Sequence, residues 1–493
     1  MFDILIKLIL IFLIVFTPIA FGSVELLAFS LMELGILLII ILWSIDSIKS
    51  KTSLISLSAI SHQPSAKNKL SLFYQSAIVN RQSAMPFILL SLFLFLILFQ
   101  LLPLPSGVLK VVSPKTWALR HQLLITNSSF ELSALSFPLS FFPFATQIEF
   151  FKWLTLIGLF FFLLRWRHSK KDVIRLIPII MLVGVAESLY GMFEFFSGHK
   201  HILHLNMEAE IAAVTGTFLN RNYFAGYLLM VIPLSLGYLF SREATQINRF
   251  RGWRERLISL DGKTLLIGFC VIVMVLGLLF SASRMGISSL LLSFSLISFL
   301  FRNPEKGKRF SKTVALIFGL ALLWAAWIGL DAVISRFFTS SEDFKGRWIF
   351  WVNTFQIFKD FPIFGSGLGT FTWVFPMYRS FHLIGIATHA ENDYLQLASE
   401  VGLVGVGLLL ILFLFFFYKA VSGIRSLSHR DSGRYIGIGG LVGILALMFH
   451  SIVERNIQVP SNALLYVILW AIVLRISLTK KGEISAYKMN QTN

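Results

Sequence analysis

Long apolar runs separated by short polar connections are the dominant pattern of the chain. A helix needs about 20 mostly apolar residues to cross the hydrocarbon core of a bilayer, and about 12 stretches come close to that length. They predict transmembrane helices over residues 4–22, 25–45, 86–104, 148–165, 175–197, 223–240, 264–281, 286–301, 312–331, 401–418, 435–453 and 460–477. The pattern therefore predicts an all-α polytopic membrane protein.

The first of these runs resembles a signal peptide in position. A second apolar run follows it almost at once, and residues 17–22 form a weak cleavage site. We interpret residues 4–22 as a retained first helix.

The composition supports membrane insertion. A soluble domain carries about 25% charged residues, whereas this chain of 493 residues carries 14% and is 56% hydrophobic. The net charge of +18 suggests a nucleic-acid partner, but such a partner requires a contiguous basic face. Here the basic residues stand in short clusters between apolar runs, so no nucleic-acid partner is expected. The single cysteine, Cys270, excludes an intrachain disulfide.

Lysines and arginines concentrate in alternate connections between the predicted spans. Basic residues near helix ends stay on the cytoplasmic side. Because the alternation continues along the whole chain, we expect a multi-pass protein with both termini in the cytoplasm.

Two connections on the outer side are long, residues 105–147 and residues 332–400. A structureless connection of nearly 70 residues is uncommon and is usually functional. Within the second one, the apolar spacing of residues 346–360 predicts a short helix lying on the membrane surface. Pro362 and three glycines should end that helix in a tight turn; the glycines are Gly365, Gly367 and Gly369. This Gly-x-Gly-x-Gly string is weak evidence for phosphate binding and fits a loop between two interfacial helices better.

Arg221 and Arg284 also fall on the outer side, where the positive-inside rule disfavours basic residues. Asn220, Asn222 and Ser283 flank them, and small or amide-bearing neighbours allow an anion to approach. Guanidinium groups bind phosphate in a bidentate way. We therefore expect Arg221 and Arg284, with Asn220 and Asn222, to bind a lipid pyrophosphate. The alternative is that both arginines reach out to lipid head groups.

Two acidic residues, Glu187 and Glu194, fall in the fifth predicted span seven residues apart, and hence on one helical face. Carboxylates inside a membrane are functional candidates. A structural pairing with a basic residue on a neighbouring helix is an equally good interpretation.

Four segments together resemble a known family. Residues 216–225 resemble a Gly-Thr-Phe-x-Asn-x-Asn-x-x-Ala signature, and residues 281–286 resemble Ser-x-Ser-Arg-x-Gly. Residues 347–371 resemble an Arg-x-x-x-Trp segment followed by Asp-x-Pro-x-x-Gly-x-Gly-x-Gly-x-Phe, and residues 389–405 resemble His-Ala-x-Asn-Asp-Tyr-Leu-Gln followed by Glu-x-Gly-x-x-Gly. In order and spacing they are similar to the O-antigen ligase and O-antigen polymerase superfamily, over roughly residues 200–470.

This resemblance implies a glycosyltransferase of the bacterial inner membrane. Such an enzyme takes a glycan from an undecaprenyl-pyrophosphate carrier at the periplasmic face, without a metal or other cofactor. It joins the glycan to a hydroxyl of lipid A core, of another lipid-linked glycan or of a protein. Other polysaccharide assembly proteins are possible partners. Ligase and polymerase activity both fit the residues.

The resemblance also divides the chain. It implies N-terminal transmembrane helices over residues 1–200, which include the periplasmic loop 105–147. A ligase-like membrane domain follows over residues 201–477, with a helical periplasmic subdomain in the loop 332–400. Residues 478–493 form a cytoplasmic tail.

The resemblance assigns roles to individual residues. Family ligases place the proposed base, a histidine, directly before the motif asparagine, Asn392. Here that position is Glu391, and the nearest histidine is His389. Either side chain is able to take a proton from an acceptor hydroxyl, and on a helix two residues so spaced point about 200° apart, so only one would face the substrate. Residues expected along the glycan are Arg347, Trp348, Asn392, Asp393, Tyr394 and Glu454.

Two other classes of protein share parts of this pattern. A polysaccharide flippase or other transporter fits twelve spans with cytoplasmic termini equally well, but should place its polar groups near the midplane and often shows repeats. A non-catalytic subunit of an envelope-assembly complex would tolerate the absent histidine. Neither a nucleotide-binding motif nor a metal-ligand cluster is predicted from the spacing of residues.

Overall fold

The structure is a computed structural model of the chain. It describes residues 2–58, 85–127, 136–166, 174–199, 201–206, 213–246, 261–301, 319, 340–383, 385–429 and 431–491.

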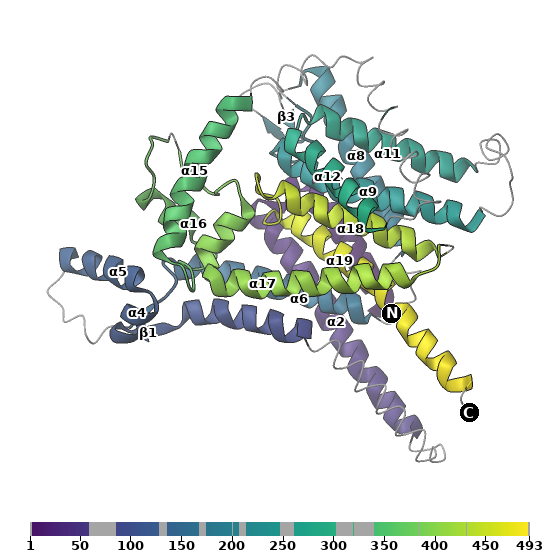
Figure 1. Ribbon diagram of the computed structural model, residues 1–493, viewed down its shortest axis with the longest axis horizontal. Coiled ribbons are helices and arrows are strands. Elements are labelled where there is room, and N and C mark those ends of the chain that lie inside the picture. The colour runs from purple at the N-terminus through teal and green to yellow at the C-terminus, as the bar shows by residue number, and fades with distance from the viewer. Residues whose placement is uncertain are drawn as a thin grey trace.

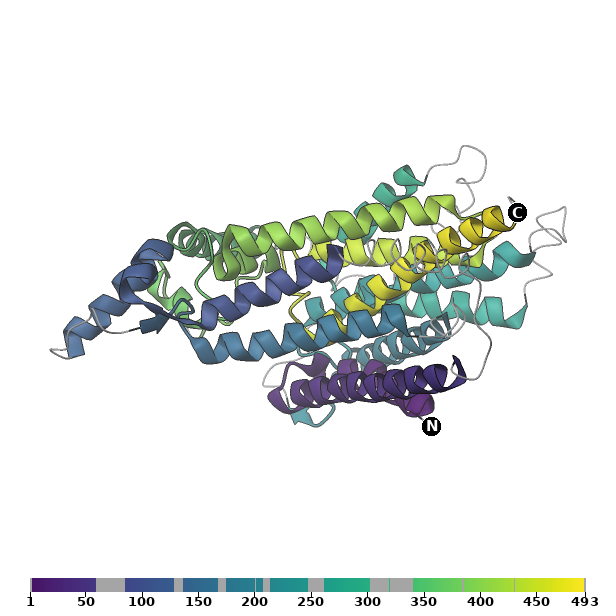
Figure 2. The ribbon, with the colours of Figure 1, turned by 90° about the horizontal axis from the view of Figure 1, so that it is seen from below.

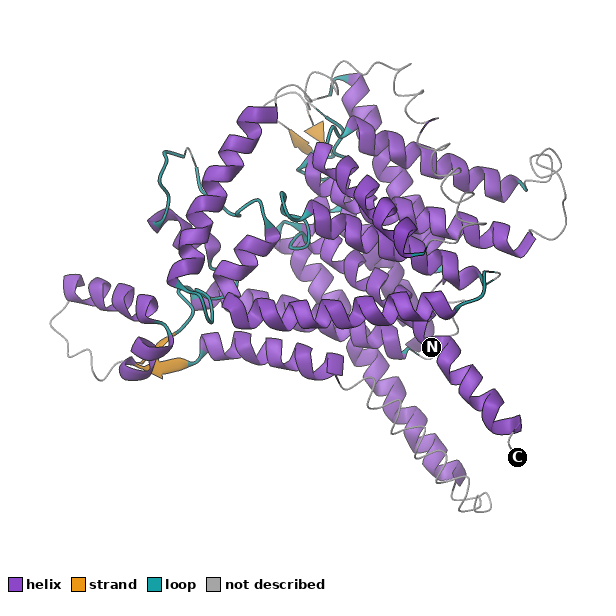
Figure 3. Cartoon of the chain, viewed as in Figure 1, coloured by secondary structure: helices purple, strands orange, loops and turns teal. Residues whose placement is uncertain are grey.

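Helices make up almost all of the regular structure (Figure 3). The long helices are α1 (Phe2–Ile19), α2 (Leu26–Ser58), an unlabelled helix (Met85–Leu101), α6 (Pro143–Arg165), α8 (Leu176–Ser197), α9 (Arg221–Gln246), α11 (Gly262–Phe280), α12 (Arg284–Leu300), α15 (Ser340–Asp360), α17 (Asp393–Ser426), α18 (Ser432–His450) and α19 (Pro460–Gln491). Shorter elements are η1 (Phe21–Ser23), α4 (Ser106–Val112), α5 (Pro114–Asn127), α16 (Phe371–Val374) and η4 (Phe375–Met377). Two antiparallel strand pairs complete the fold, β1 (Pro103–Pro105) with β2 (Ser136–Pro138) and β3 (His201–Ile202) with β4 (Leu205–Asn206).

The protein is an all-α polytopic membrane protein, as the apolar runs predict. Among the described residues, 9 helices are long and apolar enough to cross a membrane, and two further apolar helices, Met85–Leu101 and Arg284–Leu300, are slightly shorter. Each of these coincides with a predicted span. The predicted span 312–331 lies outside the described residues.

The tenth predicted span, residues 401–418, lies in α17, which also contains a further helical stretch before it that begins at Asp393. Gly402 interrupts the helix with φ 63° and ψ −170°, and the helix continues on its far side. A left-handed residue inside a helix leaves no trace in the apolar periodicity, so the pattern showed only the part of the helix after Gly402.

Helices α9 and α18 form the centre of the bundle. Both are mostly buried, and their backbones approach closely because small residues line the contact. A Cβ at Gly439 would lie 2.2 Å from the Pro233 carbonyl oxygen on α9. Small residues allow this kind of close packing between membrane helices. Outward-facing positions on the surrounding helices carry large exposed apolar side chains, among them Leu27, Phe95, Phe151, Phe269 and Phe299.

The described parts of the two long connections lie at one end of the bundle. Helices α4, α5, α15 and α16 lie together there, while α1 begins and α19 ends toward the opposite end (Figures 1 and 2). The helix expected over residues 346–360 is confirmed and is longer, Ser340–Asp360. The other connection is partly helical as well, through α4 and α5. This arrangement places the loops that carry the four motif segments near one another.

The turn after α15 packs backbone against backbone on the first turns of α17. Gly365, Gly367 and Gly369 all have positive φ, 73°, 111° and 79°. A Cβ at Gly365 would lie 2.1 Å from the carbonyl of Glu400, and one at Gly402 would lie 2.3 Å from the carbonyl of Ile363. Glycine at these positions is therefore a packing requirement of the turn.

Replacing Gly402 by alanine should destabilise the protein, because the new Cβ meets backbone and the left-handed conformation costs about 1–3 kcal/mol. We expect a lower midpoint in a thermal unfolding experiment in detergent. Gly407→Ala is the matched control, because it lies in the same helix with nothing within 4 Å of the added Cβ. Equal midpoints for the two variants would contradict this account of the turn.

Candidate functional site

Two carboxylates and an arginine meet where α15, α17 and the loop after α18 come together. Arg347 of α15 forms an ion pair with Glu454, whose side chain is only 3% exposed. Glu454 also shares a hydrogen bond with Glu391, the residue two before α17. The Trp351 indole N–H donates to the carbonyl oxygen of Glu391 at 3.3 Å. One polar cluster therefore forms where the loop 451–459, α15 and the segment before α17 meet. We call its two acids, Glu391 and Glu454, the carboxylate pair.

The charges in this cluster favour one retained proton. Burial, together with the neighbouring Glu391 carboxylate, raises the pKa of Glu454 to about 8, although Arg347 acts in the opposite direction. Two carboxylates this close are not both ionised easily. With one proton on the pair, the single remaining negative charge is balanced by Arg347.

The carboxylate pair also touches α9. The Asn222 side chain forms a hydrogen bond with Glu454. Asn220 caps the helix, because its Oδ1 accepts the Asn222 N–H at 2.8 Å. Arg221 stands between these two asparagines, and its Nη1 is buried without a hydrogen-bond partner within the described part of the chain.

Glu187 of α8 fixes the loop that leads into α9. Its carboxylate accepts the Thr217 N–H at 2.8 Å and the Thr217 hydroxyl at 2.9 Å. The same hydroxyl lies 2.9 Å from the Pro18 carbonyl oxygen. Among the described residues, the hydrogen bonds of Glu187 are with this loop and not with a basic residue on a neighbouring helix, and they give Glu187 a structural role of another kind.

A buried polar chain connects the start of α12 to the same region. The His450 ring lies 3.3 Å from Ser283 Oγ through Nε2 and 3.1 Å from Asn456 Nδ2 through Nδ1. Asp393 accepts the Asn456 and Ile457 N–H groups at 2.8 and 2.7 Å. Arg284 follows Ser283 directly, so this series of hydrogen bonds fixes the position of Arg284 relative to the loop that carries Glu454.

A cavity of about 400 Å³ opens beside this cluster. Its walls come from α6, α17 and α19 and are mostly apolar, with Phe160, Phe413 and Trp470 among them. Polar groups occur where these helices begin, and they include Glu149, Lys152, His389 and Arg455. Glu149 and Phe160 both line the cavity from α6, about 16 Å apart along the helix axis. The cavity is therefore long and apolar, with one polar end.

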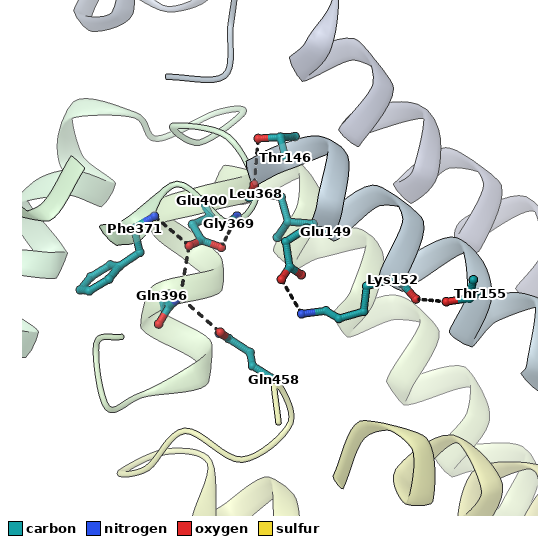
Figure 4. A network of polar contacts seen from close by, with 10 residues as sticks. All are labelled: Thr146, Glu149, Lys152, Thr155, Leu368, Gly369, Phe371, Gln396, Glu400 and Gln458. Carbon is teal, nitrogen blue, oxygen red and sulfur yellow. Dashed lines mark hydrogen bonds and ion pairs between the residues drawn. The ribbon is translucent and has the colours of Figure 1, made fainter. Parts of the chain in front are cut away.

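Figure 4 shows the network behind that polar end. Glu400 accepts the N–H groups of Gly369 and Phe371 at 2.9 and 3.1 Å. The Gln396 amide donates to Glu400 and to Gln458, each at 3.2 Å. Lys152 pairs with Glu149 at 2.5 Å on the facing side.

The Gly-x-Gly-x-Gly turn is not a phosphate cradle in this structure. Its N–H groups are already bonded within the protein: Ser366 to the Ser399 carbonyl, Gly367 to the Glu400 carbonyl and Gly369 to the Glu400 carboxylate, at 3.0, 3.0 and 2.9 Å. The interpretation of the string as a loop between helices is the one that the contacts support.

Glu391 and His389 lie in different surroundings. Both precede α17 rather than belonging to a helix, and Glu391 has a left-handed φ of 51°, so the helical argument about their directions does not apply. Glu391 belongs to the carboxylate pair, whereas His389 lines the cavity. Burial lowers the pKa of His389 well below its usual value, and the charges of Arg455 and Lys152 act in the same direction.

Three residues expected along the glycan have other contacts. Asn392 caps α17 by accepting the Leu395 N–H at 2.9 Å. The Tyr394 hydroxyl donates to the Met448 carbonyl at 2.9 Å, while Tyr394 also lines the cavity. Trp348 is 54% exposed on α15, outside the carboxylate pair.

The sequence interpretation missed the charged pair on α6. Lys152 and Glu149 stand three residues apart in an otherwise apolar span, and that isolated pair was the available signal. Arg455 stands beside Glu454 in the sequence, but the sequence interpretation gave it no role. Its guanidinium lies 5.8 Å from the centre of the Tyr223 ring, next in sequence to Glu454 and at the wall of the cavity.

Comparison with known families identifies part of the chain. Residues 269–410 match the family model described as O-antigen ligase. This segment is therefore similar to the O-antigen ligase family. No curated protein matches the chain.

The matched segment runs from residue 269 within α11 to residue 410, about halfway along α17. It contains the Ser281–Gly286 turn, α15, the glycine turn and the Glu391 loop, while α9, α18 and α19 flank it in sequence. The family implies glycan transfer of the ligase or polymerase type by a multi-pass membrane protein with lipid-linked glycan substrates.

The raised pKa of Glu454 makes stability depend on pH. Folded Glu454 holds its proton up to about pH 8, whereas the unfolded side chain loses it near 4.5. The folded state therefore binds more protons between these values, and its stability should fall as the pH rises through this window. Because Gln does not titrate, the thermal unfolding midpoint of Glu454→Gln should fall less steeply than that of the wild type as the pH rises.

Glu25→Gln, at an exposed position in the first connection, is the control and should keep the wild-type pH dependence. An unchanged slope in Glu454→Gln would show that Glu454 is already ionised in the folded protein at neutral pH.

Proposed function

We propose that this chain transfers a glycan from an undecaprenyl-pyrophosphate carrier to an acceptor hydroxyl at the periplasmic face of the bacterial inner membrane. In this proposal both termini are cytoplasmic, and the end of the bundle that carries α5 and α15 faces the periplasm. The ligase-like unit extends over residues 201–477. The helices before residue 200 complete it, since α6 contributes one wall of the cavity.

The position of the loop 451–459 carries the proposal. Glu454 belongs to the carboxylate pair, and the next residue, Arg455, lines the polar end of the apolar cavity. A proton acceptor and a place for an anion on a lipid therefore adjoin one another. A long apolar cavity with one polar end fits a ligand that has a hydrocarbon tail and a charged head group.

In the proposed reaction, the acceptor hydroxyl oxygen attacks the anomeric carbon of the donor sugar. The bond between that carbon and the pyrophosphate oxygen breaks, and the hydroxyl proton passes to Glu391. Glu454 keeps its own proton and donates a hydrogen bond to Glu391, while Arg347 balances the charge of the pair. Arg455 at the polar end of the cavity, together with Arg221 and Arg284 of the neighbouring loops, stabilises the negative charge on the departing pyrophosphate, which is larger in the transition state than in the ground state.

Transfer by the purified protein tests this function directly. Incubated in detergent with a lipid-linked glycan and an acceptor, the protein should release the polyprenyl pyrophosphate and lengthen or modify the acceptor. A flippase or a non-catalytic subunit would leave the donor intact.

Deletion of the gene then distinguishes a ligase from a polymerase. Loss of long chains with a single repeat retained indicates a polymerase, and accumulation of a full-length lipid-linked polymer indicates a ligase.

The two candidate bases are expected to respond differently. Glu391→Gln keeps the size and the hydrogen bonds but does not accept a proton, so the transfer rate should fall by about 10²–10⁴-fold. His389→Asn should change the transfer rate by less than about tenfold, because in this proposal His389 is part of the cavity wall and takes no proton from the acceptor. The reverse ranking would make His389 the base.

The arginines are tested with the same assay. Arg221→Ala and Arg284→Ala should each lower the rate by about 10²–10³-fold, the usual effect of removing a group that stabilises developing charge. Arg379→Ala, at an exposed position in the same set of loops, is the matched control. Full activity in both Arg221→Ala and Arg284→Ala would contradict their role at the pyrophosphate.

A further inference from the structure

The end of α8 carries a second polar cluster that the proposed reaction does not use. The helix ends at Ser197, and Gly198 turns the chain back with a left-handed φ of 70°. The chain then forms the β3–β4 hairpin, in which His201 is paired with Asn206. This reversal brings His199 and His201 over Glu194, which lies on the last turn of α8.

The three side chains face one another through their ligand atoms. Glu194 Oε2 lies 3.1 Å from His199 Nδ1 and 3.4 Å from His201 Nδ1, and the ligand atoms of all three lie within 4.8 Å of one another. The two imidazole rings are stacked, with centroids 4.8 Å apart. His201 Nδ1 is buried and makes no hydrogen bond within the described part of the chain, although it points at the carboxylate.

We propose that Glu194, His199 and His201 bind a divalent transition-metal ion of the zinc type. Two atoms that each lie 2.0–2.1 Å from a tetrahedral ion are about 3.3 Å apart. The distances from Glu194 to the two histidines match that separation. Two imidazoles and a carboxylate form a common three-residue ligand set for zinc, in which the fourth position is open to water.

The surroundings of the carboxylate fit a metal site. The Tyr190 hydroxyl forms a hydrogen bond with Glu194 and accepts the Leu203 N–H at 2.7 Å. Carboxylates that bind metals are usually oriented by such outer contacts. The Glu194 side chain is 6% exposed, whereas the two histidines are 42% and 41% exposed. The site is therefore anchored on the buried side and open to an ion from solvent.

The metal would join α8 to the hairpin that follows it. The same helix carries Glu187, which holds the loop leading to Arg221. The metal site shares no residue with the carboxylate pair, so we assign it a structural role. It should raise the heat stability of the protein, because an ion that binds only the folded state stabilises that state.

The experiment uses the full-length chain, purified in detergent with an affinity tag that contains no histidine and stripped with a chelator. After equilibration with zinc and removal of free ion, elemental analysis should find about one zinc ion per chain. Cobalt(II) should give the visible absorption of a tetrahedral nitrogen and oxygen site. Zinc should also raise the thermal unfolding midpoint of the stripped protein.

The variants decide whether these three residues are the ligands. His199→Ala/His201→Ala and, separately, Glu194→Gln should lower zinc affinity at least about tenfold and remove the cobalt spectrum. His204→Ala is the matched control, because His204 follows in the same hairpin but packs edge-on against Phe21, 5.4 Å between ring centres. Elution of each variant at the wild-type volume in size-exclusion chromatography shows that it has folded.

Two results would overturn the proposal. The first is a wild-type protein that retains less than about 0.1 zinc ion per chain and gives no cobalt spectrum, which would leave the three residues as a hydrogen-bonded cluster. The second is a double histidine variant that binds zinc as the wild type does, which would place the ion elsewhere. Neither result depends on glycan transfer, so the proposed function is tested separately.

Discussion

Buried carboxylates that accept backbone N–H groups hold together the end of the bundle that carries the site. Glu187 binds the loop before α9, Asp393 binds the loop after α18, and Glu400 binds the glycine turn. Each acid lies on a helix and each partner loop comes from a distant part of the chain. Hydrogen bonds to a charged group contribute about 1.5–3 kcal/mol each, and leaving one of these N–H groups unbonded in a buried place is costly. The placement of Arg221, Glu454 and the residues around them depends on these contacts.

This arrangement separates acids that organise the site from acids available for chemistry. Asp393 and Glu400 belong to the motif segments and line the cavity, and their hydrogen bonds are with backbone N–H groups, with Ser451 and with Gln396. Glu391 and Glu454 instead form a pair beside Arg347 and Asn222. A shared proton lets one member of such a pair stay ionised, and thus basic, in a buried place. Sequence position alone does not distinguish these two kinds of acid.

Much of the fold could be predicted from the sequence, because burial in a bilayer requires apolar runs of one length. The helix over α15 was also predicted, from the spacing of its apolar positions. The early start of α17 was not, since it depends on a left-handed Gly402 that periodicity does not show. The site was predicted in part. Arg221, Asn222, Glu391, Arg347 and Glu454 were all expected, and the structure joins Asn222, Glu391, Arg347 and Glu454 in one cluster. The cavity was missed because it forms only when side chains from separate segments pack together. The Glu194–His199–His201 cluster was missed because it depends on the reversal of the chain after Gly198.

The central claim is that Asp393 and Glu400 position the site by holding backbone. Hydrogen–deuterium exchange of the full-length protein in detergent, read by mass spectrometry, tests this most directly. Removing the Asp393 carboxylate with alanine should speed exchange in residues 451–459 and leave residues 365–371 protected. Removing the Glu400 carboxylate should have the opposite pattern. Unchanged protection of both loops in both variants would contradict the claim, because the loops would then be held by something other than these two side chains.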